Sequence, residues 1–66
     1  MRIIVNGKAT EVAENSNLGE FITACTLEGK GIIAELNEKV IIRDLWVETV
    51  LKEGDCLELV SLVGGG

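Results

Sequence analysis

The sequence ends in the run Gly64-Gly65-Gly66, which is the part of the chain best suited to chemistry in another protein's active site. Glycine has no Cβ, so an extended run of three can thread a narrow channel and reach about 10 Å beyond the preceding residue. A carboxylate is a poor electrophile and must be activated before a nucleophile attacks it, most simply as an acyl-adenylate formed with ATP. We therefore predict that Gly66 is delivered to partner enzymes, although a frayed terminus would have the same composition.

The remaining residues offer little catalytic chemistry of their own. The chain has no histidine, which excludes the common Ser–His and Cys–His pairs of nucleophile and base. Its two cysteines are far apart in sequence and do not supply the roughly four ligands of a tetrahedral zinc site. The sequence contains no Cys-x-x-Cys pair and no glycine-rich phosphate-binding motif. We predict that the protein is not an enzyme and binds no metal or cofactor by itself.

The two cysteines, Cys25 and Cys56, are predicted to be free and mostly buried thiols. No secretory signal peptide is recognisable in the sequence, so we expect a reducing, cytoplasmic setting. Cys25 falls on an apolar helical stripe and is expected to be a small core residue. Cys56 follows a turn and is expected to be partly exposed. Whether the two thiols approach closely enough to pair is left open by the sequence.

The charge of the chain excludes two classes of partner. Eleven acidic and six basic residues give a net charge of −5. Nucleic-acid binding requires a basic surface that neutralises phosphates, so we predict none. The same argument excludes attachment to a membrane surface through lysines, and no segment approaches the roughly 20 apolar residues that span a bilayer. An acidic surface suits a basic protein partner, although it is also ordinary for a small soluble domain.

The first half of the chain predicts a hairpin followed by a helix. Asn6-Gly7 is the strongest two-residue hairpin signal, and it joins two strands, the second of which runs through Val12. Asn17 is a helix N-cap, and Glu20 completes a pair similar to a capping box. One helical stripe is expected to face a sheet, and it contains Leu18, Phe21, Ile22 and Cys25.

The second half predicts another hairpin and a segment that covers the core. A turn at Asn37-Glu38 joins a strand over residues 32–36 to a strand over residues 40–42. Residues 43–51 are ambiguous in their pattern and are expected to form a short helical turn and a covering loop.

The last strand, predicted over residues 56–63, is apolar enough to be central in the sheet. Leu57 and Leu59 are expected to face the core, and the other face is expected to carry Glu58, Val60 and Leu62. If this strand lies beside the first one, the two are parallel. The sequence therefore predicts an α+β domain over residues 1–63, with one helix across one face of a mixed sheet of four to five strands, and a flexible tail over residues 64–66.

Taken in their order along the chain, the two hairpins, the helix, the last strand and the glycine run resemble the ThiS family of β-grasp sulfur carriers over the whole length of the chain. "IIVNGK" resembles the opening strand and turn of that family, and "NLGEFI" resembles the start of its helix. "IIAELNEKVIIRDLW" and "LKEGDCLELVSLVGGG" resemble its middle segment and its closing strand with the glycine end. Two residues depart from the family pattern: Glu38 replaces a frequent glycine and Ile42 the usual proline, which concerns local turn geometry. The family usually lacks both cysteines, which argues against a required thiol.

The resemblance implies a ubiquitin-like β-grasp fold and a sulfur carrier of thiamine thiazole biosynthesis. A ThiF-like adenylyltransferase would activate the Gly66 carboxylate with ATP and Mg²⁺, while Gly64 and Gly65 thread into the partner. Sulfur from a cysteine desulfurase or another donor would convert the adenylate to a thiocarboxylate, and a ThiG-like thiazole synthase would accept that sulfur. The carrier itself would bind neither ATP nor metal, and it would be a monomer when free.

The sequence does not decide which surface binds a partner or which protein accepts the sulfur. Glu58, Val60 and Leu62 form a candidate docking patch beside the tail, unless Leu62 folds over the edge of the domain. A MoaD-like carrier for molybdopterin synthesis shares the fold, the tail and the activation but serves another acceptor. A non-catalytic β-grasp interaction module, or a ubiquitin-like modifier joined to lysines, would also fit these features.

Overall fold

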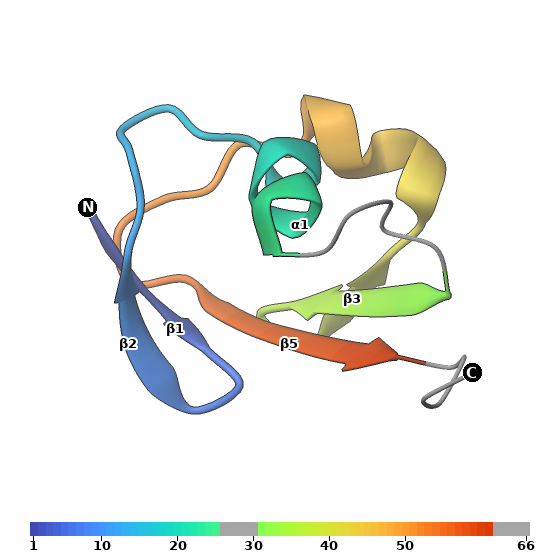
Figure 1. The fold of residues 1–66 in the computed structure, drawn as a ribbon, viewed down its shortest axis with the longest axis horizontal. Coiled ribbons are helices and arrows are strands. Elements are labelled where there is room, and N and C mark those ends of the chain that lie inside the picture. The colour runs from blue at the N-terminus through green and yellow to red at the C-terminus, as the bar shows by residue number, and fades with distance from the viewer. Residues whose placement is uncertain (26–30, 62–66) are drawn as a thin grey trace.

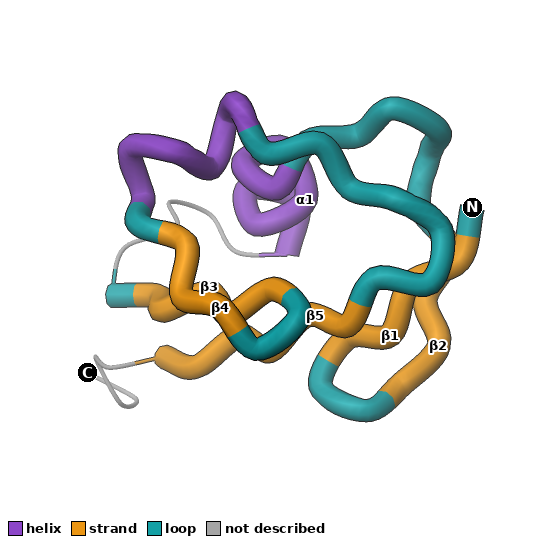
Figure 2. The backbone as a smooth tube through the Cα atoms, turned by 180° about the vertical axis from the view of Figure 1, so that it is seen from behind, coloured by secondary structure: helices purple, strands orange, loops and turns teal. Residues whose placement is uncertain are grey.

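A computed structural model describes residues 1–25 and 31–61 of the chain. Its five strands form one mixed sheet in the order β2-β1-β5-β3-β4, and both helices lie on the same side of that sheet (Figure 1). Among the described residues no helix covers the other face of the sheet, as the view from behind also shows (Figure 2). The strands are β1 (Arg2–Val5), β2 (Lys8–Glu11), β3 (Ile32–Leu36), β4 (Lys39–Ile41) and β5 (Cys56–Ser61), and the helices are α1 (Leu18–Cys25) and the 3-10 helix η1 (Arg43–Glu48).

Both hairpins turn on two consecutive residues with positive φ. Asn6 has a φ of 49° and Gly7 of 84° between β1 and β2, and Asn37 has 52° and Glu38 has 69° between β3 and β4. Two positive φ angles in a two-residue loop are typical of a type I′ turn, whose twist matches that of the flanking strands. Both predicted turns are confirmed. Glutamate rarely adopts this conformation, so Glu38 holds backbone strain that glycine would not.

The helix α1 begins with the predicted cap. The Glu20 N–H donates to Asn17 Oδ1 at 2.8 Å, and the Asn17 N–H donates to Glu20 Oε1 at 3.1 Å. This reciprocal pair is a capping box with asparagine in place of serine or threonine. Leu18 and Ile22 are fully buried, and Phe21 packs against the core from a half-buried position. The predicted apolar stripe is therefore confirmed over the first five residues of the helix.

The prediction that the thiols are mostly buried is wrong for Cys25, which was expected in the core, whereas the expected exposure of Cys56 is confirmed. Cys25 and Cys56 are both exposed and free. Cys25 lies on the predicted stripe but is the last residue of α1, and the buried contacts of the helix are made one and two turns earlier. Helical periodicity fixes the direction in which a side chain points, whereas its burial also requires that another element packs against it.

The core lies between the sheet and the two helices. It consists of Ile3, Leu18, Ile22, Ala34, Trp46, Leu51 and Leu57, none of which is more than 6% exposed. Trp46 belongs to η1, and its indole N–H donates to the Ile41 carbonyl at 2.9 Å, which ties the 3-10 helix to the edge strand β4. The predicted helical turn over this segment is therefore confirmed, and it acts as the cover of the core beside α1.

Candidate functional site

The glycines predicted to carry the chemistry, Gly64, Gly65 and Gly66, lie outside the described residues, and so does Leu62. The described strand that precedes them in sequence is β5, which ends at Ser61. The end of the predicted strand, residues 62–63, and the predicted boundary between the domain and the tail also lie outside the described residues. β5 lies at the centre of the sheet. It pairs in parallel with β1 on one side and antiparallel with β3 on the other, as predicted for β1. The strand that leads to the glycine run is thus held on both sides.

Asparagine side chains from both hairpin turns also hold β5. The Leu59 N–H donates to Asn6 Oδ1 at 2.8 Å, and the Cys56 N–H donates to Asn37 Oδ1 at 3.0 Å. β1 pairs with only the first two residues of β5, so the Asn6 side chain supplies an acceptor just beyond the end of that ladder. Sequence reasoning assigned these asparagines to their turns alone. Their second role depends on which strand lies beside each turn.

The candidate docking patch is described for two of its three residues. Glu58 is exposed, and Val60 is 54% exposed on the face of the sheet that carries no helix. Leu57 is fully buried, and Leu59 is half-buried against the core on the opposite face. The predicted alternation of β5 is therefore confirmed between residues 57 and 60.

Sequence reasoning missed the neighbours of this patch on β3 and β4. Ile33 lies directly opposite Val60, and Glu35 lies directly opposite Glu58 on one side and Val40 on the other. Ile33 is 39% exposed and Val40 is 59% exposed. The alternation of residues 32–36 was visible in the sequence. The pairing of these residues with β5 was not, because it requires the register of strands that are far apart in the chain.

An open groove lies on the helical side, between α1 and η1. It has a volume of about 670 Å³ and is lined by Gly19, Glu20, Thr23, Arg43, Trp46 and Val47, among others. A Cβ on Gly19 would meet Asn17 Oδ1 at 3.3 Å and Trp46 Cβ at 3.5 Å, so glycine allows η1 to approach the helix closely. The Arg43 guanidinium lies 6.0 Å from the centre of the Trp46 ring, at the limit of a cation–π contact. The groove mixes charges of both signs.

Within residues 1–25 and 31–61, no three side chains of His, Cys, Asp or Glu are grouped so that they could hold a metal ion. Over the same residues, no helix is long and apolar enough to cross a membrane. The described residues that lie nearest to the glycine run in sequence are those of β5, which ends at Ser61.

Comparison with known families and proteins gives consistent matches. The model of the ThiS family matches residues 3–66. The sulfur carrier protein ThiS of Escherichia coli (strain K12) is 23% identical over 66 residues, which cover the whole of both chains. A thiazole synthase of Paramagnetospirillum magneticum is 20% identical over the 66 residues, but the chain spans only 20% of the length of that protein.

Solved structures are similar over the whole chain. The crystal structure of a thiamine biosynthesis protein (ThiS) from Geobacter metallireducens has a TM-score of 0.84 and 35% identity, with full coverage of both chains. An NMR solution structure of a thiamine biosynthesis protein from the same organism has a TM-score of 0.81 and 35% identity, and the match covers all of this chain and 88% of that one. The predicted ubiquitin-like β-grasp fold is confirmed by this similarity and by the five-stranded mixed sheet.

Proposed function

The chain belongs to the ThiS family of sulfur carriers of thiamine biosynthesis, and from this premise we propose that Gly66 is the residue that carries the sulfur. A sulfur carrier is a protein co-substrate and not an enzyme, which agrees with the lack of histidine in the chain. The observation that carries the proposal is the match to the ThiS family model, which extends through the glycine run to residue 66.

The proposed chemistry has two steps at the Gly66 carboxylate. A ThiF-like adenylyltransferase, which would bind ATP and Mg²⁺ itself, lets a carboxylate oxygen attack the α-phosphorus of ATP, and pyrophosphate leaves. A sulfur nucleophile then attacks the carbonyl carbon of the acyl-adenylate, and AMP leaves with the original oxygen. Sulfide as the donor gives the thiocarboxylate directly, whereas a persulfide formed by a cysteine desulfurase gives an acyl disulfide, from which a second thiol releases the thiocarboxylate and forms a disulfide. Gly64 and Gly65 provide the reach, because three residues without Cβ atoms pass a narrow entrance most easily.

The proposed acceptor of the sulfur is a ThiG-like thiazole synthase. In the Paramagnetospirillum magneticum protein, which is named a thiazole synthase, a segment similar to this whole chain is part of the synthase polypeptide. Two modules joined in one chain meet at a high effective concentration, so covalent linkage supports a shared reaction. We propose that the same encounter occurs here between separate chains.

The proposed docking patch is the surface of β5 beside the tail, formed by Glu58, Val60 and Leu62. Glu58 and Val60 are exposed on the face of the sheet without helices, where a partner can approach without displacing the core. An exposed apolar side chain at the centre of such a patch favours protein contact.

The intact mass of the carrier tests the proposal directly. The full chain is incubated with its cognate adenylyltransferase, MgATP and a sulfide donor, and we expect a mass gain equal to the exchange of one oxygen for sulfur. A variant without residues 65–66 is the control, and it should stay unmodified under the same conditions. Oxidation of Met1 to the sulfoxide gives a similar gain but would also appear in the control. If no adenylated or thiolated form of the full chain appears, the carrier proposal is wrong.

A further inference from the structure

The backbone of β1 bonds to β5 in the regular pattern of a parallel pair until the chain turns away. In such a pair, a residue of one strand bonds to two residues of its neighbour, through its N–H to the first and through its carbonyl to the second. The Ile4 N–H donates to the Asp55 carbonyl at 2.8 Å, and two residues later the Asn6 N–H donates to the Leu57 carbonyl at 2.9 Å. A strand that continued beyond this point would next offer its own carbonyl to the Leu59 N–H.

At Asn6 a side-chain oxygen takes the place of that carbonyl. The chain turns here with a φ of 49°, and Asn6 Oδ1 accepts the Leu59 N–H at 2.8 Å. Val5 and Leu57 form the last pair of the ladder, so no residue of β1 lies opposite Leu59. The position therefore needs a residue that tolerates positive φ and carries an oxygen on a short side chain. Asparagine and aspartate meet both requirements.

This contact marks the point where β5 ceases to be held from both sides. Val60 and Ser61 lie opposite Ile33 and Ile32 of β3. Within residues 1–25 and 31–61, the bond at Leu59 is the last hydrogen bond that the first hairpin makes to β5. The Asn6 side chain thus fixes the course of the backbone seven positions before residue 66.

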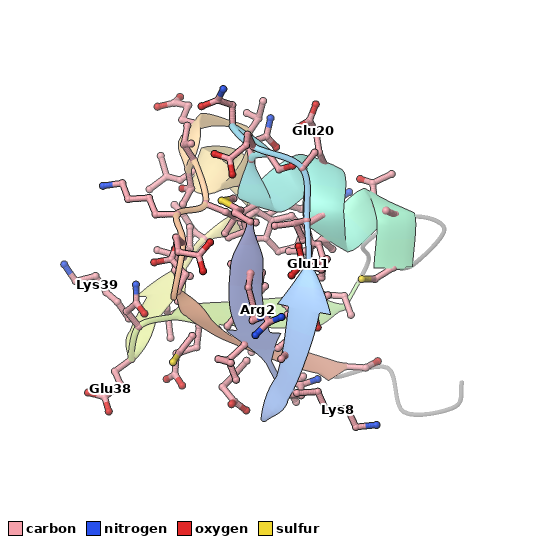
Figure 3. All side chains as sticks on the ribbon, turned by 90° about the vertical axis from the view of Figure 1, so that its left-hand side faces the viewer. Arg2, Lys8, Glu11, Glu20, Glu38 and Lys39 are labelled. Carbon is pink, nitrogen blue, oxygen red and sulfur yellow. The ribbon has the colours of Figure 1, made fainter. Side chains whose placement is uncertain are left out.

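The second hairpin makes a matched contact at the other end of β5. Asn37 also comes first in its turn, with a φ of 52°, and its Oδ1 accepts the Cys56 N–H at 3.0 Å. Cys56 is the first residue of β5, whereas Asn6 holds the strand further along toward the glycine run. The tips of the two hairpins lie on different sides of the molecule, as Lys8 at the first tip and Lys39 at the second show (Figure 3).

We propose that Asn6 is a positioning residue for the adenylation of Gly66. By holding Leu59, its side chain restricts the directions in which β5 leads into the residues that follow. A reacting segment whose course is fixed before binding loses less entropy when the reactive complex forms, and its carboxylate is more often in line with the α-phosphorus of ATP. Asn6 acts through the backbone of Leu59 and not by contact with the reacting atoms. This inference rests on the proposed adenylation of Gly66.

The test compares Asn6→Gly with Asn37→Gly in a steady-state adenylation assay with the full chain and its cognate adenylyltransferase. Glycine tolerates positive φ, so each variant keeps its turn and loses only the side chain. We expect kcat of Asn6→Gly to fall about fivefold, because the carboxylate is less often aligned, while KM for the carrier stays within about twofold. Asn37→Gly should change both constants less than about twofold, and Asn6→Asp, which keeps the acceptor, should retain at least about half of the wild-type kcat.

Amide exchange and thermal unfolding separate positioning from stability. The Leu59 amide hydrogen should exchange faster in Asn6→Gly than in the wild type and at an unchanged rate in Asn37→Gly, because only the first variant loses its acceptor. Asn37→Gly also loses the bond from Asn37 Nδ2 to Asp55 Oδ1 at 3.1 Å, so its Tm should be no higher than that of Asn6→Gly. A fall in kcat confined to Asn6→Gly is then not an effect of lower stability.

The outcomes distinguish this inference from the proposed function. If the wild type is never adenylated, the proposed function fails and the positioning role fails with it. If the wild type is adenylated and the two glycine variants have equal kcat values, or if Asn6→Gly raises KM alone, only the positioning role is wrong. An unchanged exchange rate at Leu59 in Asn6→Gly would show that Asn6 does not hold the strand, and it would overturn the inference as well.

Discussion

Replacing Glu38 by glycine should stabilise the domain, because the backbone at this position is strained. Glu38 has a φ of 69° in the turn between β3 and β4, and its exposed side chain forms no hydrogen bond or ion pair with a described residue that would stabilise this conformation. The left-handed region costs an ordinary residue about 1–2 kcal/mol. Glycine avoids this penalty but gains conformational freedom in the unfolded chain, which costs about 0.4–1 kcal/mol. The difference predicts a gain of about 1 kcal/mol in the free energy of unfolding for Glu38→Gly.

Thermal unfolding followed by circular dichroism measures this effect. For a domain of this size, about 1 kcal/mol corresponds to a rise of about 4–8 °C in Tm. Glu38→Ala separates the contribution of the backbone to stability from that of the side chain. Alanine keeps the penalty for positive φ, so this variant should have nearly the Tm of the wild type. Lys39→Gly places a glycine one residue later, inside strand β4, and should lower the free energy of unfolding by about 0.5–1 kcal/mol. If Glu38→Gly melts at or below the temperature of Glu38→Ala, the strain argument is refuted.

Three further substitutions test the contacts that position the site. Asn17→Ala removes the acceptor for the Glu20 N–H and should lower the free energy of unfolding by about 1 kcal/mol, measured by urea titration; an unchanged midpoint would contradict the capping box. Asn6→Ala places alanine at a positive φ and removes the acceptor for the Leu59 N–H, so the free energy of unfolding should fall by about 2–3 kcal/mol. Asp also tolerates a positive φ and keeps the acceptor oxygen, so the free energy of unfolding of Asn6→Asp should stay within about 1 kcal/mol of the wild type. Val60→Thr keeps a β-branched residue on β5 but replaces one apolar methyl group by a hydroxyl, so Tm should stay unchanged. The KM of the adenylyltransferase for the carrier should rise about fourfold, and an unchanged KM would show that Val60 is not part of the docking patch.

The parts of the fold that sequence reasoning predicted correctly are governed by neighbours in the chain. Asn6-Gly7 specifies its turn through the φ angles that these two residues tolerate. Asn17 and Glu20 specify the start of α1 through hydrogen bonds that span three residues. The central position of β5 was predicted from its apolar composition, and its parallel pairing with β1 was expected on the condition that the two strands are neighbours, which they are.

The parts that sequence reasoning missed depend on contacts between distant segments. Cys25 has the correct helical phase, but its exposure is decided by how far the packed elements extend along α1. The opposition of Glu35 and Glu58 joins residues separated by a helix and a long loop, and a shift of one residue in register would place them on opposite faces. The sequence contains both glutamates and both alternations, yet only the register makes them a repulsive pair.

The order of the strands bears on the proposed delivery of Gly66 to partner enzymes. A chain of 66 residues has a thin stability margin, and a terminal strand at the edge of a sheet would open at a small cost in free energy. Here β5, the last of the described strands, lies between β1 and β3, is tied to both hairpin turns by Asn6 and Asn37, and buries Leu57 completely. Detaching β5 would break both ladders and open the core, so its release requires nearly the free energy of global unfolding. If a partner draws the C-terminal residues into its active site as proposed, it acts on a strand that is paired on both sides.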